Sequence, residues 1–340
     1  MEREDLMKTE NILEVTDLKT YFFRGKKIFK AVDGVSFHIE KGETLCIVGE
    51  SGSGKSITSL SIMGLIPEPG GRIESGSITF DGKDLTSITK KEMMSIRGND
   101  VSMIFQEPMT SLNPVLTIGF QVMEPLIEHR KWKKKNAKEK AIELLNMVGI
   151  ARADKIFHSY PHQLSGGMRQ RVMIAIAISC DPKLLIADEP TTALDVTIQA
   201  QILDLLRTIK DDIDSSILLI THDLGVVAEM ASRVIVMYGG QIVEEATVEE
   251  IFDFPKHPYT KGLLGSVPKL EEERDRLIQI KGIVPSADKY PKGCRFAPRC
   301  KFARSECFDN EIMLRKVNSK HFVRCVLYDD PLVKIKEEKK

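Results

Sequence analysis

The residues with the clearest chemical pattern form the run Gly49-Glu50-Ser51-Gly52-Ser53-Gly54-Lys55-Ser56. This run fits G-x-x-x-x-G-K-[ST], the P-loop that wraps nucleotide phosphates. Its glycines let backbone N–H groups turn towards anionic oxygens, and the N-terminus of the following helix adds a favourable dipole. We expect Lys55 to neutralise β- and γ-phosphate charge and the Ser56 hydroxyl to bind Mg²⁺. The next residue, Ile57, completes the predicted nucleotide-binding loop.

Two adjacent carboxylates, Asp188 and Glu189, follow the apolar run at 184–187. Because successive strand residues point to opposite faces, the two side chains can have different roles. We expect Asp188 to hold Mg²⁺ through its water shell, and Glu189 to polarise the water that attacks the γ-phosphate. The pair alone could be an acidic cap at a strand end, but the P-loop upstream favours catalysis.

A serine–glycine turn, Ser165-Gly166-Gly167, precedes a helix that we expect to start near Arg169. Ser165 and the glycine amides could bind phosphate at the helix N-terminus. The structural alternative is a flexible helix cap. One chain hardly needs two γ-phosphate sites, so we expect the second site to serve the nucleotide of a partner chain.

The elements around these motifs indicate an α/β fold with a parallel sheet. The runs at 184–187 and 217–220 are continuously apolar, as in strands buried on both faces. Apolar residues at helical spacing over 198–209 predict a crossover helix between them. Further β runs and one hairpin are expected at 12–15, 28–32, 35–39, 44–48 and 234–243, with a mostly helical region over 120–180.

The composition limits the function classes. The 340 residues contain 49 Lys and Arg and 49 Asp and Glu, a balance that gives no reason to expect a nucleic-acid partner. No apolar run approaches the length of a membrane span, and the N-terminus lacks the apolar segment of a signal peptide. We therefore expect a soluble chain on the cytoplasmic side.

Six motifs occur in a fixed order, and this order resembles the ATPase subunit of ABC transporters over residues 12–250. The motifs are the P-loop, Gln106, the run Leu164–Met168, Asp188-Glu189, Ala193-Leu194-Asp195 and His222. The resemblance implies a RecA-like P-loop NTPase core with an antiparallel β subdomain and a helical signature subdomain. It also implies an ATP hydrolase that uses ATP and Mg²⁺ and works as a dimer. Met168 stands where glutamine is commoner in the family.

The resemblance also assigns roles to single residues. Gln106 resembles the glutamine that touches Mg²⁺ and water and senses the membrane partner, and His222 resembles the histidine that contacts the γ-phosphate. Asp195 resembles an aspartate that crosses the dimer interface. Phe22, with Tyr21 as the alternative, is expected to stack on adenine, although either ring could belong to the core. The resulting catalytic set is Lys55, Gln106, Glu189 and His222.

Two further stretches are similar to ATPases of oligopeptide and dipeptide importers: residues 97–114, and the run that begins His257-Pro258-Tyr259. This resemblance implies import of peptides at the cytoplasmic face of the cell membrane. It implies as partners a second ATPase subunit, identical or related, two integral-membrane permease subunits and an extracytoplasmic solute-binding protein. The alternatives are import of nickel or another small solute, and a soluble non-transport ABC ATPase with an iron–sulfur cluster acting on ribosomes or DNA.

The C-terminal part, with frequent prolines, is expected to be a separate loop-rich module. Its cysteines Cys294, Cys300, Cys307 and Cys325 have the spacing C-x5-C-x6-C-x17-C. Four thiolates suit either a [4Fe–4S] cluster or tetrahedral zinc, although the paired C-x2-C knuckles usual for zinc do not occur. The importer resemblance favours the [4Fe–4S] cluster, with a structural or a redox role; unligated cysteines remain a third option. The predicted domains are 12–254, with a helical subdomain at about 107–180, and 255–335.

Overall fold

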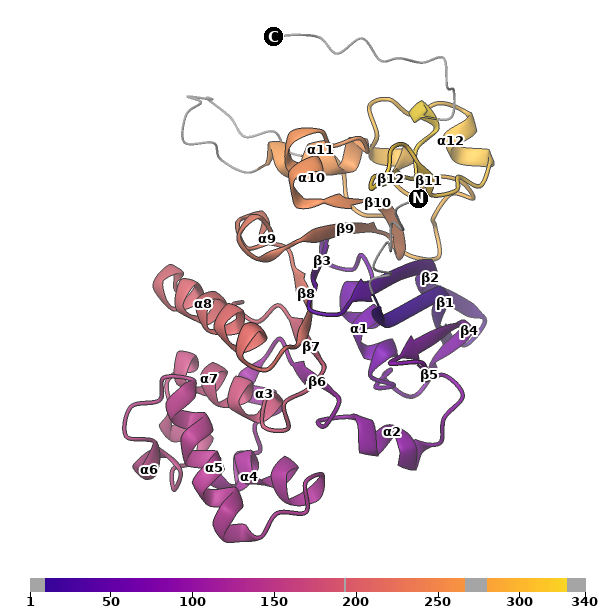
Figure 1. The fold of residues 1–340 in the computed structure, drawn as a ribbon. Helices are drawn as coiled ribbons and strands as arrows, with labels where there is room; N and C mark the ends of the chain where they lie inside the picture. Colours follow the sequence, from indigo (N-terminus) through magenta and orange to yellow (C-terminus); the bar gives the residue numbers. More distant parts are fainter. Residues whose placement is uncertain (1–9, 193, 267–279, 329–340) are drawn as a thin grey trace, which may run out of the picture.

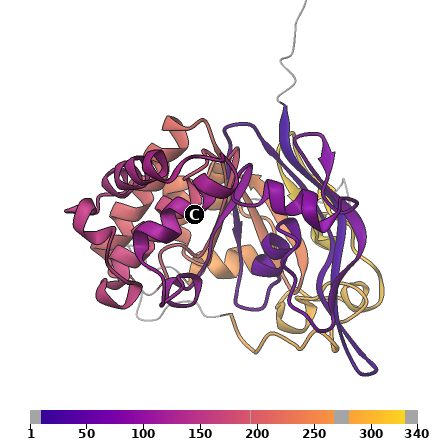
Figure 2. The same ribbon diagram turned by 90° about the horizontal axis from the view of Figure 1, so that it is seen from below.

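The computed structural model describes residues 10–192, 194–266 and 280–328 (Figure 1). Ala193, the segment 267–279 and the end of the predicted C-terminal domain (329–335) lie outside the described residues. Two sheets and a group of helices form the chain. Figures 1 and 2 both place the helical group and the smaller sheet on opposite sides of the larger sheet.

The larger sheet has the strand order β11-β12-β10-β9-β3-β8-β7-β6. Strands β9, β3, β8, β7 and β6 pair in parallel, as predicted for the apolar runs. The strands of this sheet are β3 (Thr44–Val48), β6 (Val101–Ile104), β7 (Leu184–Asp188), β8 (Ser216–Thr221), β9 (Arg233–Tyr238), β10 (Gln241–Thr247), β11 (Arg315–Lys316) and β12 (Phe322–Val323). The predicted crossover helix is α8 (Val196–Asp212), between β7 and β8.

The central strands are apolar on both faces because each face packs against a different core. In β3, Cys46 and Val48 lie in the core that includes the helical group, whereas Leu45 and Ile47 lie in the core under the smaller sheet. Cys46 is fully buried, so it serves in packing, as expected for a thiol within an apolar strand.

The smaller sheet is antiparallel, with the order β2-β1-β4-β5. Its strands are β1 (Asn11–Arg24), β2 (Lys27–Glu40), β4 (Gly71–Phe80) and β5 (Lys83–Asp84). The predicted β runs at 28–32 and 35–39 are one strand: Gly34 has φ +75° inside β2, so the glycine marks a local irregularity rather than a turn. Strand β4 has few buried side chains, which explains why the sequence pattern missed it.

The helical group between β6 and β7 coincides with the predicted helical region. It contains α3 (Pro108–Ser111), α4 (Ile118–Glu128), α5 (Lys134–Met147), α6 (Ala153–Ile156), the 3-10 helix η1 (Pro161–Gln163) and α7 (Gly166–Ala177). The remaining helices are α1 (Lys55–Ile62), α2 (Lys90–Ile96), α9 (Leu224–Met230), α10 (Val248–Asp253), α11 (Pro258–Gly265), η2 (Ala297–Arg299), α12 (Glu306–Asp309) and η3 (Val326–Tyr328). No helix in the described part of the chain has the length and hydropathy needed to cross a bilayer.

The C-terminal segment is loop-rich, as predicted, but it does not stand apart from the core. Strand β12 pairs with β10 through Glu244 and Val323, so the larger sheet continues past the predicted boundary at 254/255. The domain boundaries themselves stay predictions. Within residues 10–192, 194–266 and 280–328, no group of three or more His, Cys, Asp or Glu side chains is arranged to hold a metal ion, so a metal-cluster module is not shown.

Candidate nucleotide-binding and catalytic site

The P-loop joins β3 to α1 at the carboxyl end of the central strand. Two of its glycines are required by close approach of the backbone. A Cβ on Gly49 would lie 2.2 Å from the Met237 carbonyl oxygen, and a Cβ on Gly54 would lie 2.5 Å from the Ala31 carbonyl oxygen. Gly54 also has φ +101°, which side chains rarely adopt. The loop is therefore fitted against β2 and β9 in a shape that other residues would disturb.

Lys55 and Ser56, for which contacts to phosphate and Mg²⁺ are predicted, are the first two residues of α1. Lys55 Nζ donates to the carbonyl oxygens of Gly49 (2.7 Å) and Glu50 (3.1 Å), and the residue is 5% exposed. Burial lowers the pKa of Lys55, while the carboxylates of Glu189, Asp188 and Glu50 oppose this effect. The ammonium group thus lies inside the loop, surrounded by oxygens.

Asp188, at the end of β7, lies beside Ser56. The Ser56 hydroxyl donates to Asp188 Oδ1 at 3.1 Å. Burial raises the pKa of Asp188 to about 6, and the adjacent Glu189 charge acts in the same direction, whereas the Ser56 hydroxyl counteracts both. The Lys55 ammonium also lowers this pKa but does not offset burial, and a bound Mg²⁺ would favour the charged carboxylate further.

Three side chains hold the Glu189 carboxylate. Gln106 Nε2 and Thr192 Oγ1 donate to Glu189 Oε2 at 3.0 Å and 2.9 Å. His222 Nδ1 lies 3.2 Å from the same oxygen. Gln106, Glu189 and His222 follow the neighbouring strands β6, β7 and β8, and the carboxyl ends of parallel strands meet at one edge. Glu189 has φ +47°, a conformation that is uncommon outside glycine and clusters at functional sites.

A cavity of about 400 Å³ lies at this edge of the sheet. It is lined by Val48, Gly49, Glu50, Ser51, Gln106, Glu189, His222, Leu224 and Leu263. The first residues of the predicted loop therefore face one space together with Gln106, Glu189 and His222. Lys55, Ser56 and Asp188 are not among the residues that line it. The sequence reasoning missed Thr192, whose position three residues after Glu189 was the available signal, and Leu263 from the C-terminal segment, for which the chain offered none.

Other predicted residues lie at helix N-termini outside this lining. The Ser165 side chain caps α7 by accepting the Met168 N–H at 3.3 Å, and Asp195 caps α8 by accepting the Ile198 N–H at 3.0 Å. Ser165, Gly166 and Asp195 are exposed, and Gly167 is half-buried against Ile198. The structure thus separates the serine–glycine turn from the P-loop cavity of its own chain.

Tyr21 and Phe22 are neighbours in β1 and differ in environment. Tyr21 Oη donates to Asp33 Oδ1, and the ring lines a second cavity with Lys19, Lys30 and Arg295. Phe22 packs near Gly71, where a Cβ would lie 2.6 Å from Phe22 Cε1. Both rings are half-buried. The adenine-stacking role stays a prediction for either residue.

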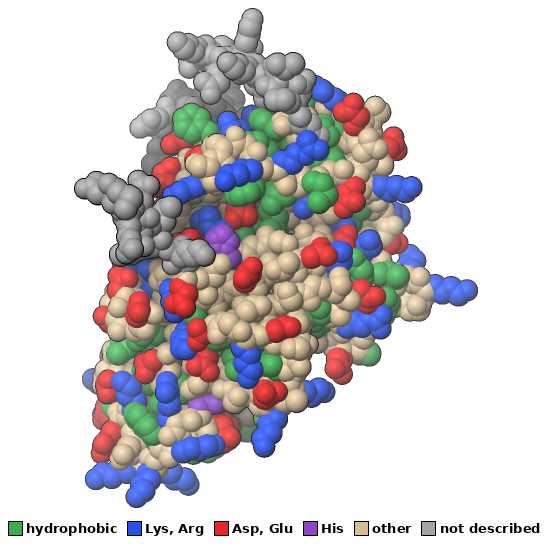
Figure 3. Space-filling model, turned by 45° about the vertical axis from the view of Figure 1, so that its right-hand side comes forward, with side chains coloured by type: hydrophobic (Ala, Val, Ile, Leu, Met, Phe, Trp, Pro, Cys, Tyr) green, Lys and Arg blue, Asp and Glu red, His purple; other side chains and the backbone are tan. Residues whose placement is uncertain are grey.

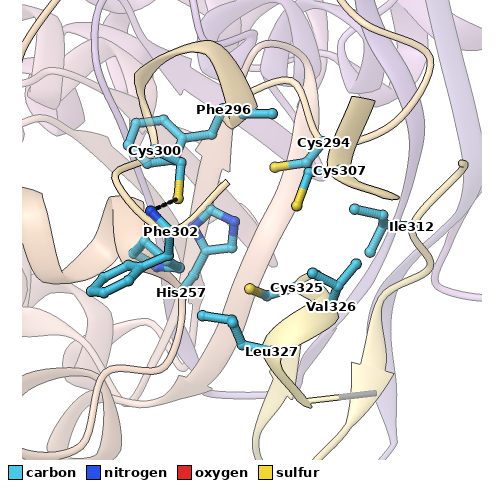
Figure 4. Close-up of a pocket in the computed structure, with 12 residues that line it drawn as sticks. His257, Cys294, Phe296, Cys300, Phe302, Cys307, Ile312, Cys325, Val326 and Leu327 are labelled. Atoms are coloured by element: carbon cyan, nitrogen blue, oxygen red, sulfur yellow. Dashed lines mark hydrogen bonds between the residues drawn. The ribbon is translucent and has the colours of Figure 1, made fainter. Parts of the chain in front are cut away.

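The four C-terminal cysteines line one small apolar cavity together with His257 and Phe296 (Figure 4). In this view the His257 ring lies between Cys300 and the pair Cys294 and Cys307. Burial raises the pKa of Cys294 to about 11 and that of Cys325 to about 12, and the neighbouring cysteines add to both effects. The cavity is therefore unfavourable to thiolates unless a cation compensates their charge.

Comparison with known proteins identifies two families. Residues 32–192 match the family described as ABC transporter, and residues 243–307 match the family described as oligopeptide/dipeptide transporter, C-terminal region. The chain is 63% identical to the oligopeptide transport ATP-binding protein AppD of Bacillus subtilis, over 94% of this chain and 97% of that protein. It is 52% identical to the dipeptide transport ATP-binding protein DppD of Haemophilus influenzae, over 92% and 94%.

Solved structures agree with this result. A dimeric post-hydrolysis state of the ATP-binding cassette MJ0796 bound to ADP and Pi has a TM-score of 0.63 at 28% identity, over 69% of this chain and 98% of that one. The protein cbiO1 of Clostridium perfringens, part of an ABC transporter complex, has a TM-score of 0.61 at 26% identity, over 72% and 92%. The predicted ATPase fold is confirmed. The chain therefore belongs to the ATP-binding proteins of oligopeptide/dipeptide ABC transporters, and it is an ATP hydrolase of the ABC type.

Proposed function

We propose that this chain hydrolyses ATP to power import of oligopeptides or dipeptides through separate membrane subunits. The observation that carries the proposal is the Glu189 carboxylate, which Gln106, Thr192 and His222 hold at the P-loop cavity. A general base must be fixed near the phosphate that is attacked, and these contacts fix it. The peptide specificity of the proposal comes from the relatives, which are oligopeptide and dipeptide transport proteins.

In this mechanism the P-loop amides and Lys55 bind the β- and γ-phosphates. Ser56, Asp188 and Gln106 would hold Mg²⁺, which would neutralise charge on the phosphate oxygens. Glu189 accepts a proton from the attacking water, and His222 donates a hydrogen bond towards the γ-phosphate. The aromatic ring of Phe22 or Tyr21 stacks on adenine.

The site is completed by a second ATPase subunit. Ser165, Gly166 and Gly167 are exposed or half-buried at the N-terminus of α7, the twelve-residue helix Gly166–Ala177, and lie outside the cavity of their own chain. In a head-to-tail dimer they contact the γ-phosphate bound by the partner, and Asp195 lies at the same interface. The dimeric cassette among the structural relatives supports this arrangement.

The proposed partners are two permease subunits and an extracytoplasmic binding protein, with this chain attached at the cytoplasmic face of the membrane. ATP closes the dimer, and hydrolysis reopens it; the segment after Gln106 transmits this motion to the permease. Import of nickel and action on ribosomes or DNA are less favoured. On the face shown in Figure 3, acidic and basic side chains are interspersed rather than gathered in a basic patch.

Substitution of the proposed base tests the mechanism. Glu189→Gln keeps the shape of the side chain but cannot take a proton, so ATP turnover should fall by about 10²-fold or more while ATP binding and ATP-dependent dimerisation persist. The control is Glu143→Gln, which removes only an exposed ion pair with Lys140. Phosphate release and light scattering provide the readouts. Full ATPase activity of Glu189→Gln would refute the assigned role.

Substrate class needs a test of its own. The chain is reconstituted in vesicles with its permease and binding protein, and ATPase activity is measured with dipeptides, oligopeptides or Ni²⁺ outside. Stimulation by peptides supports the proposal. Stimulation by Ni²⁺ alone, or co-purification with ribosomes instead of membrane subunits, would favour the alternatives.

We further propose that the four cysteines hold a [4Fe–4S] cluster that secures the C-terminal segment. Backbone N–H groups donate to the thiols. The Phe302 N–H donates to Cys300 Sγ and the Arg304 N–H donates to Cys307 Sγ, both at 3.4 Å. Backbone amides likewise favour the thiolates of Cys294 and Cys325. Such bonds are typical of cysteines that ligate iron–sulfur clusters.

A buried histidine nitrogen supports the same group. His257 Nδ1 accepts the Tyr259 N–H at 3.0 Å, so the ring proton lies on Nε2. Nε2 is buried without a hydrogen-bond partner among the described residues, and the ring lines the cysteine cavity. A sulfur atom there would satisfy this donor.

Metal analysis of anaerobically purified protein tests this proposal. We expect about four iron atoms per chain and a broad visible absorption band, both lost in Cys300→Ser. Cys180→Ser, which changes a buried thiol elsewhere, should leave them unchanged. One zinc per chain without iron would refute the cluster.

A further inference from the structure

The P-loop and the four-cysteine cavity are connected at one residue, Glu50. Arg299, which directly precedes Cys300, donates from Nη1 and Nη2 to the two carboxylate oxygens of Glu50 at 2.7 Å and 3.2 Å. The side chains of Arg299 and Glu50 are 6% and 28% exposed. A two-point, charge-assisted contact with a largely buried arginine is both strong and geometrically specific.

A second connection reaches the backbone of the same residue. The Glu50 N–H donates to Tyr259 Oη at 2.8 Å. Tyr259 is fully buried, and its own N–H donates to Nδ1 of His257, which lines the cysteine cavity. The side chain and the backbone of Glu50 are thus held separately by two residues of the C-terminal segment.

The connection is rigid because aromatic rings pack beneath it. Tyr238 lies with its ring centroid 4.8 Å from that of Tyr259 and 5.2 Å from that of Phe296. The rings of Tyr259 and Phe296 are 5.4 Å apart, and Phe296 itself lines the cysteine cavity. Arg299 Nη1 also donates to Tyr238 Oη at 3.4 Å. A packed cluster of this kind transmits a displacement rather than absorbing it.

Displacement of Glu50 would reach the catalytic lysine directly. The carbonyl oxygens of Gly49 and Glu50 accept the hydrogen bonds of Lys55 Nζ. A shift of this peptide therefore changes where the ammonium group is held relative to the phosphates. Glu50 also lines the P-loop cavity, so its carboxylate must be kept from repelling the bound triphosphate.

We propose that Arg299 and Tyr259 are positioning residues for the P-loop. Through them, we infer, the affinity for nucleotide depends on whether the four-cysteine site is intact. Arg299 turns the Glu50 carboxylate towards the C-terminal segment and neutralises it, while Tyr259 fixes the Glu50 peptide. The proposal rests on the P-loop as the ATP site, and it holds for any metal group at the cysteines.

The test uses the full-length chain and compares Arg299→Met, Arg299→Lys and Tyr259→Phe. Binding of a fluorescent ATP analogue and the steady-state KM and kcat of ATP hydrolysis are measured. We expect the Kd and KM to rise about fivefold or more, with kcat changing by less than about twofold, because the substitutions disturb binding rather than the Glu189 base. Arg299→Lys should recover part of the affinity, since a lysine keeps the charge but not the two-point contact.

Tyr328→Phe is the matched control. It removes a tyrosine hydroxyl from the same segment, one that donates to the Lys256 carbonyl oxygen at 3.1 Å. Its nucleotide affinity should equal that of the unchanged chain. An equal loss in Tyr328→Phe would mean that any damage to the segment has this effect, and it would overturn the specific role of Tyr259.

A double-mutant cycle and a cysteine variant complete the test. If Arg299 acts through Glu50, Glu50→Gln combined with Arg299→Met should have the Kd of Glu50→Gln alone, not the product of both effects. Cys300→Ser alone should weaken nucleotide binding. Added to Arg299→Met, it should have little further effect. Additive effects, or unchanged affinity in folded Arg299→Lys and Tyr259→Phe, would refute the inference. Absence of nucleotide binding in the unchanged chain would instead refute the proposed function.

Discussion

Asp188→Asn should make the nucleotide-free protein more stable at neutral pH. Burial raises the pKa of Asp188 from its ordinary value of 3.8 to about 6. Between about pH 4 and about pH 6 the folded chain keeps a proton that the unfolded chain has released, so the free energy of unfolding falls as the pH rises. The difference between these two pKa values, multiplied by about 1.36 kcal/mol per pKa unit, lowers the free energy of unfolding by about 3 kcal/mol above pH 7.

Asparagine keeps an acceptor for the Ser56 hydroxyl and carries no charge, so most of this penalty should disappear. The attraction to Lys55 is already part of the raised pKa, so the expected gain at pH 7.5 is about 3 kcal/mol. The assay is thermal and urea unfolding without nucleotide and Mg²⁺, from pH 4.5 to pH 7.5. The stabilisation should grow with pH, and Mg²⁺-dependent ATPase activity should be lost. Asp212→Asn, at the exposed end of α8, is the control. Equal stability of Asp188→Asn and the unchanged chain at pH 7.5 would refute the reasoning.

Four further substitutions address other parts of the site. Gly49→Ala should destabilise the chain by about 2 kcal/mol or more and abolish ATP binding, because the added Cβ would lie 2.2 Å from the Met237 carbonyl oxygen. Thermal unfolding and nucleotide titration check this. Ser165→Arg should leave ATP binding by single subunits intact but prevent the ATP-dependent dimer, as measured by light scattering; a normal dimer would contradict the composite site. If one of the two rings stacks on adenine, its change to alanine (Phe22→Ala or Tyr21→Ala) should weaken binding of ATP but not of inorganic triphosphate. A variant that weakens binding of both ligands equally would assign its ring to the core.

The candidate catalytic edge of the sheet could be predicted because its signals are local. A glycine-rich loop between a strand and a helix, and carboxylates after an apolar strand, occupy a few consecutive positions each. Parallel pairing of β6, β7 and β8 then brings Gln106, Glu189 and His222 together without further information. Strand β4 was missed because it has little buried surface, and with so few buried side chains it gives no periodic pattern.

The sequence by itself determined the identity of the chain as an ABC-type ATPase, because phosphate binding depends on residue types at short, fixed spacing. It could not determine how the C-terminal segment meets the core. Arg299 and Glu50 are 249 positions apart, and β12 joins the sheet at β10. Such contacts depend on which surfaces pack together, and an exposed arginine and a buried one are the same letter in the chain. Only the tertiary structure showed that Arg299 and Tyr259 connect the four-cysteine cavity to the P-loop.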